Sequence, residues 1–452
     1  MRRTEIVRVG IAVVILELAV AGLNVNAQSV DSLLDKLVEK GILTVKEANA
    51  LREEADKDFT KAYQVKSGLP DWVTSLKLSG DLRARYEGFY GENAAFVDRH
   101  RFRYRARVGV TASLVENFEA GVRLSSSERA DNFGGDPISG NATLMDNASK
   151  KFIFIDLAYA KWTAINSASV GLVGTVGKME NPFVFSDMVF DPDYTPEGGA
   201  VQLSYTVSDA HVLRLNTGWF ALDELGASSH DPYMVGAQAR WDANWSRKVS
   251  TTAGIAFLAI ANRHALSNAA LPNINRGNTR VGAASAVAAP RYGLNPVVAD
   301  AALTYALDSF PYYNGPFPMR VAADYMVNPA APRSADNYAY TLSATLGRAG
   351  RKRTWELGYS WKWLGANAWW EELVDSDFGA YYAGANSPPN SGFNAGYGAG
   401  TNAKGHIIRA AYSPTDHLTL AARVFLTELI EPFPPGSESG MTRLQVDALL
   451  RF

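Results

Sequence analysis

Polar and apolar side chains alternate with a period of two, most clearly between residues 101 and 114. Successive side chains of a β-strand point to opposite faces, so this pattern predicts one strand with an apolar face and an arginine-bearing face. Unpaired charges are costly in a dry core, so the arginine face needs water and the other face needs apolar surroundings. The first face carries Arg101, Arg103, Arg105 and Arg107, and the second carries Phe102, Tyr104, Val108, Val110 and Leu114.

The same alternation recurs from about residue 76 to the C-terminus. It predicts sixteen strands, an even number, as expected of single-chain bacterial barrels. Their approximate ranges are 76–88, 101–114, 117–127, 152–163, 169–177, 200–208, 211–221, 233–242, 249–260, 297–307, 318–328, 337–347, 353–364, 405–412, 416–427 and 442–452.

The lengths of the connections supply a test that the strand assignment did not use. Every second connection is long, as at 128–151 and 365–404, and the others are short, except for 308–317. A soluble β-sandwich also has strands in which polar and apolar residues alternate. Nothing in its architecture requires long and short connections to alternate. Long loops outside and short turns inside are typical of outer-membrane proteins. The sequence therefore predicts an all-β transmembrane barrel of about 16 antiparallel strands, with a short N-terminal helical segment.

The N-terminal residues follow a different pattern. A basic start, a largely apolar stretch at 11–21 and small residues at 25–27 predict a secretory signal peptide, with a short anchor helix as the alternative. Beyond it, Leu, Val and Ala recur at helical spacing, and Thr44 and Glu47 form a capping box. The predicted domains are a signal peptide at 1–27, a periplasmic helical segment at 28–70 and an outer-membrane β-barrel at 71–452.

Composition and charge narrow the function classes. Without residues 1–27, the chain has 41 basic and 44 acidic residues, a net charge of −3, which argues against nucleic acid as a partner. Six scattered histidines form no metal-ligand spacing, and neither H-E-x-x-H nor G-x-S-x-G occurs. We therefore predict no catalytic residues, no metal site and no cofactor. The absence of cysteine fits an exported protein that folds without disulfides.

One segment, from Gly177 to Ala200, resembles the putative porin family of Gram-negative outer membranes and, more distantly, the phosphate-selective porins. That family's loop starts with G-[RK]-x-x-N-P-F, continues through an aspartate-rich middle and closes with P-E-G. The stretch from Gly41 to Ala48 and the terminal Phe452 also resemble the family's N-terminal segment and C-terminal aromatic. The matching loop residues are Gly177, Lys178, Asn181, Pro182, Phe183, Asp187, Asp191, Asp193, Pro196, Glu197 and Gly198.

This resemblance implies that the third outward connection, 178–199, folds into the lumen as a constriction loop. We take its charged residues as candidate site residues: Lys178, Glu180, Asp187, Asp191, Asp193 and Glu197. Opposite them we expect a pore-lining basic wall of Arg83, Arg85, Arg103, Arg105, Arg107 and Arg123. Opposed acidic and basic surfaces would set up a field across a narrow aqueous pore. The alternatives are an ordinary solvated loop, and arginines that pair with lumenal acids and set no selectivity.

The predicted register also gives the sign of the net charge on the inner wall. Sixteen basic and eight acidic residues fall on inward positions of the strands, an excess of +8, and the third loop subtracts four. Rings of Arg and Lys favour anions, so a mild anion preference is expected. In the 365–404 loop, Trp369, Trp370, Tyr381 and Tyr382 could stack sugar rings, although a surface loop packed by its own aromatic residues is the favoured interpretation.

The sequence as a whole predicts a porin in the bacterial outer membrane, through which small hydrophilic solutes, anions among them, diffuse passively. Outer-membrane lipid is the expected surrounding, and a homotrimer is implied by resemblance only. The main alternative is a structural anchor that contacts peptidoglycan through its N-terminal helices. A barrel hydrolase is the weaker alternative.

Overall fold

The computed structural model describes residues 69–93, 96–129, 134–272, 276–281, 287–379, 400–432, 435–436 and 438–452. The predicted signal peptide at 1–27 and nearly all of the predicted helical segment at 28–70 lie outside the described residues. The chain divides into two units, Met1–Thr74 and Ser75–Phe452. The second unit contains the architecture described below.

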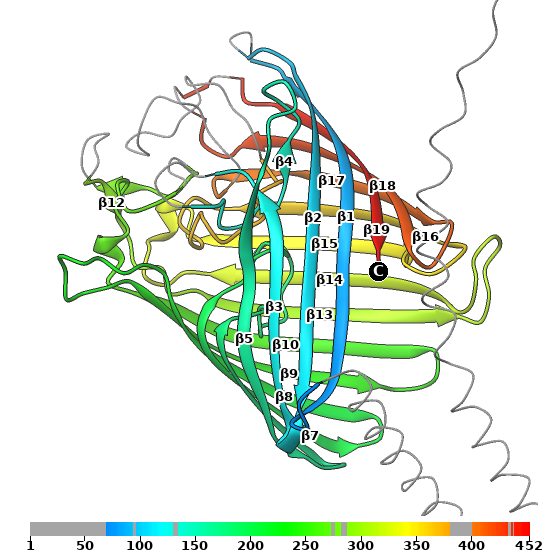
Figure 1. The fold of residues 1–452 in the computed structure, drawn as a ribbon. Helices are drawn as coiled ribbons and strands as arrows, with labels where there is room; N and C mark the ends of the chain where they lie inside the picture. Colours follow the sequence, from blue (N-terminus) through cyan, green and yellow to red (C-terminus); the bar gives the residue numbers. More distant parts are fainter. Residues whose placement is uncertain are drawn as a thin grey trace, which may run out of the picture. The chain divides into compact units, whose positions relative to one another are not determined.

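The second unit is a closed antiparallel β-barrel, to which the described residues contribute sixteen long strands. Each strand pairs with its neighbours in sequence, and β1 pairs with both β2 and β19, which closes the sheet. Figure 1 shows β1 in blue between β2 and β19. The strands are β1 (Val73–Gly91), β2 (Arg99–Leu114), β3 (Phe118–Ser127), β5 (Phe152–Asn166), β6 (Val170–Lys178), β7 (Glu197–Ser208), β8 (His211–Ala221), β9 (Tyr233–Asn244), β10 (Val249–Ala261), β13 (Val297–Leu307), β14 (Phe317–Val327), β15 (Tyr338–Gly347), β16 (Thr354–Leu364), β17 (Ala403–Ser413), β18 (Leu418–Leu429) and β19 (Met441–Arg451).

The barrel confirms the fold predicted from the alternation, and each of the sixteen predicted ranges overlaps one of these strands. The largest differences lie at strand ends, since β1 extends three residues beyond its predicted range at either end. Three short strands in the long connections were not predicted, because two residues are too few to show a period: β4 (Ala142–Thr143), β11 (Arg280–Val281) and β12 (Ala289–Pro290). No helix among the described residues has the length and apolar character needed to cross a membrane.

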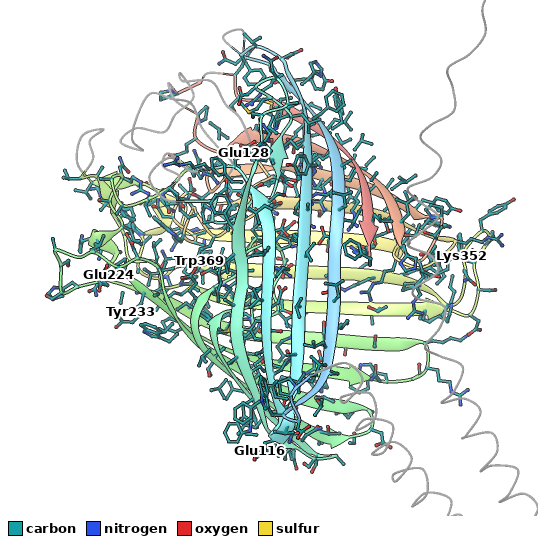
Figure 2. All side chains as sticks on the ribbon, in the orientation of Figure 1. Glu116, Glu128, Glu224, Tyr233, Lys352 and Trp369 are labelled. Atoms are coloured by element: carbon teal, nitrogen blue, oxygen red, sulfur yellow. The ribbon has the colours of Figure 1, made fainter. Side chains whose placement is uncertain are left out.

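The parity of the connections is also confirmed. Glu116 and Lys352 belong to short turns at one end of the strands, and Glu128 and Glu224 belong to long connections at the other end (Figure 2). The turn between β2 and β3 is tight enough to hold Glu116 at a φ of 59°. The connection 308–316 is the longest on the short side, and a bridge between Phe310 and Tyr313 folds it back on itself.

The two faces of each strand differ as the alternation requires. Within β2, Phe102 is 59% exposed, whereas Arg103 and Arg105 are 7% and 5% exposed. Exposed apolar side chains such as Val108 and Val110 continue around the outside of the sheet. An apolar outer face suits hydrocarbon, and the charged side chains are left for the interior.

Aromatic rings contact one another near both ends of the strands. At the short-turn end, Trp162 stacks on Phe118 with ring centroids 5.7 Å apart. At the other end, Trp219 lies 5.8 Å from Tyr233. Such rings belong at the membrane–water interface. Phe89 differs from these rings because its position in β1 faces inward. It is fully buried, and the guanidinium groups of Arg101 and Arg443 lie over its ring.

We expect Val108→Arg to destabilise the barrel by about 2–4 kcal/mol, because it places a charge on the lipid-facing side near the middle of β2. Thr111→Arg, on the inward face of the same strand, is the control and should cost much less. The free energy of folding into lipid vesicles measures both effects. Equal costs for the two variants would contradict the assignment of the faces.

Candidate functional site

The third long connection, residues 179–196 between β6 and β7, folds against the inner wall of the barrel. It begins after Gly177, whose φ of 107° and whose close approach to the Ala158 carbonyl oxygen leave no room for a side chain. Farther on, Gln238 on β9 accepts a hydrogen bond from the amide of Val184 at 2.9 Å and donates one to its carbonyl at 2.7 Å. Arg240, also on β9, donates to the same carbonyl at 3.0 Å.

A second segment, residues 365–379 of the connection between β16 and β17, packs against the third connection. The amide of Asp191 donates to the Leu373 carbonyl at 2.7 Å, and the amide of Asp375 donates to the Asp187 carbonyl at 3.1 Å. Trp369, labelled in Figure 2, lies between the two ends of the barrel with its ring against Phe190. We call residues 179–196 and 365–379 together the lumenal insert.

The favoured prediction for 365–404, a surface loop packed by its own aromatic residues, is wrong for residues 365–379, which pack inside the barrel. Trp369 and Trp370 are 0% and 2% exposed, and they belong to one apolar cluster with Phe190, Met188 and residues of the wall. Neither ring is open to a sugar in this structure. The apolar residues between Ala366 and Val374 explain the burial, since their side chains gain more by packing inside than by contact with water. Tyr381 and Tyr382 lie outside the described residues.

The predicted acidic loop and basic wall meet directly at Asp193. Its carboxylate accepts hydrogen bonds from Arg105 at 2.8 Å and from Arg107 at 3.2 Å. Both arginines also bind Asp81 on β1, so one carboxylate of the wall already balances one of their two positive charges. Charged hydrogen bonds of this kind hold their partners firmly and in a defined orientation.

Other predicted basic residues of the site form ion pairs with acids of the wall, of a loop or of both. Arg123 pairs with Glu180 of the loop and with Asp156 of the wall, and Lys178 pairs with Glu197 at 2.9 Å. Arg103 lies 3.5 Å from Glu128. The structure thus joins Arg105, Arg107 and Arg123 to the loop.

Arg85 reaches the second segment of the insert instead. It lies 3.2 Å from Asp377, and Arg443 donates to the other oxygen of this carboxylate at 2.7 Å. Burial opposes the ionisation of Asp377, but Arg443 and Arg85 outweigh it and hold the pKa of Asp377 well below its usual range. Asp377 was not among the predicted site residues. Its only sequence signal is the acidic run of Glu371, Glu372, Asp375 and Asp377 within an apolar stretch.

The insert is also tied to the wall by a buried lysine. Lys362 on β16 is fully buried, with its Nζ atom 2.6 Å from Asp187 and 3.5 Å from Asp375. Burial opposes the ionisation of Asp187, but Lys362 overcomes it and lowers the pKa of Asp187. One wall cation thus holds one carboxylate from each half of the insert, a link that periodicity cannot reveal.

A cavity of about 320 Å³ separates the insert from the basic wall. Its lining contains Arg83, Arg85, Arg105, Arg409, Arg423 and Arg451, and also Asp187, Asp191, Asp193, Asp375, Asp377 and Asp447. Arg83 donates to Asn141 at 2.7 Å. Within the described part of the chain, no carboxylate oxygen lies within 4.0 Å of Arg83, Arg423 or Arg451. Their charges therefore face the cavity without a directly paired acid.

Two carboxylates of this cavity resist ionisation. Burial raises the pKa of Asp191 to about 8, and the nearby charges of Asp375 and Asp193 add to the effect. Burial also raises the pKa of Asp375 to about 6, although Lys362 opposes it. The negative charge on this side of the cavity is therefore smaller at neutral pH than the number of carboxylates suggests. Among the described residues, no group of three or more His, Cys, Asp or Glu side chains is arranged to hold a metal ion.

A closed barrel with an apolar exterior, a charged interior and a lumenal insert has the architecture of outer-membrane β-barrels. Residues 91–287 match the sequence profile of a family described as "Putative porin". The matched span includes the segment from Gly177 to Ala200, so the resemblance inferred from that loop is confirmed. Over these residues, less than half of the chain, the protein is similar to that family.

Solved structures with a similar fold are bacterial outer-membrane barrels. OprB of Pseudomonas putida, solved at high pH, gives a TM-score of 0.50 at 8% identity, and the match covers 88% of this chain and 97% of that chain. OmpF of Salmonella typhi, solved with daunomycin, gives 0.45 at 10% identity, covering 83% and 97%. At these identities the likeness concerns the fold alone. No curated protein matches the sequence at a significant level.

The protonation of Asp191 predicts a pH-dependent insert. Its raised pKa means that the folded state holds a proton that the unfolded state has released, so this stabilisation is complete at low pH and is lost as pH rises through about 8. We expect hydrogen exchange at residues 187–194 and 370–376, corrected for intrinsic rates, to quicken as pH rises from the ordinary value of 3.8 to about 8 and to level off above it.

Asp191→Asn should flatten this pH dependence, whereas Asp209→Asn, on the exposed turn between β7 and β8, should preserve it. The same slope in the Asp191 variant and the unaltered protein would show that another group controls the insert. Hydrogen exchange measured by mass spectrometry gives the protection of each segment separately.

Proposed function

We propose that this protein is a porin whose water-filled channel passes small hydrophilic solutes by passive diffusion, with a mild preference for anions. The third loop, 178–199, narrows the channel. The observation that carries the proposal is the 320 Å³ cavity between the lumenal insert and the basic wall. A charged, incompletely paired cavity inside a closed barrel suits the passage of hydrated solutes.

The charge balance of this cavity supports the anion preference. Asp193 is paired with Arg105 and Arg107, and Asp187 is paired with Lys362. Asp191 and Asp375 have raised pKa values. Arg83, Arg423 and Arg451 have no carboxylate within ion-pairing distance among the described residues. The excess charge that faces a passing solute is therefore positive.

Narrowing by the third loop is supported by its attachment to the wall. If the loop lies across the channel, its release should widen the path. Lys362→Met removes the buried cation that holds Asp187 and Asp375, and it leaves two buried carboxylates without their partner. Breaking a buried pair in this way costs about 3–5 kcal/mol, enough to loosen the insert.

We expect Lys362→Met to raise the single-channel conductance in planar bilayers and to make the open-channel current noisier. Lys352→Met, on the exposed turn between β15 and β16, is the control and should leave the current unchanged. Circular dichroism establishes that both variants are folded. An unchanged conductance in the folded Lys362 variant would exclude the loop as the narrowing element.

The anion preference is tested by the reversal potential across a salt gradient. In the unaltered protein we expect the sign of an anion-preferring channel. Replacing both Arg83 and Arg423 by Gln should reduce the anion-to-cation permeability ratio by roughly 30-fold, since each of the two charges near the path contributes on the order of 1 kcal/mol. Arg348→Gln, on a short turn, is the control. Cation preference in the unaltered protein would refute the proposal.

We further propose that residues 1–27 are a signal peptide, that 28–70 form a periplasmic helical segment and that the barrel assembles as a homotrimer. Chemical cross-linking in outer-membrane vesicles tests the trimer. A folded barrel that conducts no current would favour the alternative of a structural anchor, for which binding to isolated peptidoglycan is the test. We propose no enzymatic activity, and release of a fluorophore from an ester substrate by the pure protein would contradict this view.

A further inference from the structure

A second cavity, of about 760 Å³, lies on the side of the long connections. Its lining comes from the ends of β3, β5, β6, β7 and β8 next to those connections, and from the connections 128–151, 179–196, 222–232, 262–296 and 365–402. Trp370, Glu372 and Leu373 of the lumenal insert line it, and Asp375 of the same segment lines the 320 Å³ cavity. The insert therefore contributes side chains to both cavities.

Glu372 is the unusual residue of this larger cavity. It is 6% exposed, and its Oε1 atom is buried without a hydrogen-bond partner. Its carboxylate has no ion-pair partner within 4.0 Å in the described ranges. Burying an acidic group without a partner is costly, so Glu372 lacks the compensation that buried acids normally have.

Glu371, the adjacent residue, is a carboxylate of the same segment whose role is structural. Glu371 is fully buried and pairs with Arg280, and it accepts hydrogen bonds from the amides of Arg276 at 3.1 Å and Asn278 at 2.7 Å. These partners account for Glu371 as part of the folded framework. Nothing comparable accounts for Glu372, which instead lines the cavity.

The rest of the lining indicates what kind of partner would fit. A metal ion needs several convergent oxygen or nitrogen ligands, and the described residues contain no such group around Glu372. The lining also contains the apolar and aromatic side chains of Leu266, Leu271, Trp370, Leu373 and Tyr194. Its charged residues are Glu372, Asp136, Asp156, Glu197, Asp223 and Lys178, and Glu372 is the buried one among them. A buried carboxylate in a cavity with apolar surface suits an organic ammonium ion, whose charge and stem each find a matching surface.

We propose that this cavity binds a small organic monoammonium ion with an apolar stem, and that Glu372 forms the ion pair with its ammonium group. The proposal goes beyond the porin function, because it assigns a binding site rather than a path. It is compatible with anion preference, since selectivity is attributed to the narrower cavity on the other side of the insert. A bound ammonium ion would also supply the missing partner of Glu372.

The protonation of Glu372 gives the site a pH dependence. Burial raises the pKa of this carboxyl group to about 8, with Arg276, Glu371, Arg280 and Asp136 as the other charged groups that act on it. Below this value the empty site is mostly neutral, and the ammonium ion must displace a proton in order to bind. Affinity should therefore rise between pH 6 and pH 9, while an alkylammonium ion remains charged.

The test is saturation-transfer NMR with butylammonium and the refolded full-length protein in detergent micelles, with butanol as the uncharged probe. We expect butylammonium to bind, butanol to bind much more weakly and Glu372→Gln to lower the affinity at least tenfold. Glu224→Gln removes an exposed acid of the 222–232 connection outside this lining and is the control, which should retain binding. Identical micelles in all samples cancel the partitioning of the probe into detergent.

Equal binding to the Glu372 variant and the unaltered protein would overturn the proposal, as would equal binding of butanol or no binding at all. If the Glu372 variant fails to fold, the pH titration of the unaltered protein decides, and an affinity that does not rise with pH refutes the site. Binding is measured without any current. A protein that binds butylammonium but does not conduct would contradict the porin proposal and leave this one intact.

Discussion

Backbone hydrogen bonding is the constraint on which the rest of the structure depends. Inside a membrane no water is available to the amide and carbonyl groups of a strand, so every strand needs a partner on both edges. The pairing of β1 with β19 meets this need by leaving the sheet without an open edge. Closure then forces each strand to present one face to lipid and one to the interior, and the arginine-bearing face of β2 is directed inward.

An interior lined with arginine creates a second requirement, which the lumenal insert helps to meet. Arg105 and Arg107 have Asp81 on the wall and Asp193 on the insert as partners. Among the described residues, both ion-pair partners of the fully buried Lys362 lie on the insert. The insert is therefore held in place by charges that the barrel would otherwise bury at a high cost, and its own apolar cluster around Phe190 and Trp369 keeps its two segments together.

The same arrangement separates two chemical environments inside one barrel. On one side of the insert, guanidinium groups such as those of Arg83 and Arg423 face a cavity whose acids are paired or have raised pKa values. On the other side, the Oε1 atom of Glu372 is buried without a hydrogen-bond partner among the described residues. A solute that crosses the barrel would meet these environments in sequence. Solute selection would then depend on both the narrow cavity and the approach to it.

The sequence by itself determined the barrel, its sixteen strands and the side on which each long connection lies. It could do so because period-two alternation is a local property that each strand carries in its own residues. The same register identified Arg103, Arg105 and Arg107 as inward residues, and the loop from Gly177 to Ala200 was recognisable by its motif. This alternation did not reveal short strands such as β4 or the exact ends of β1.

Only the tertiary structure decided which charges meet. Lys362 and Asp187 are far apart in the chain, and so are Arg443 and Asp377. No spacing rule connects them, because their contact depends on how two long connections fold back into the barrel. The burial of Trp369 and Trp370, and the contrast between the paired Glu371 and the unpaired Glu372, have the same origin. Periodicity tells which way a strand residue points, whereas the partner that it meets depends on the packing of segments distant in sequence.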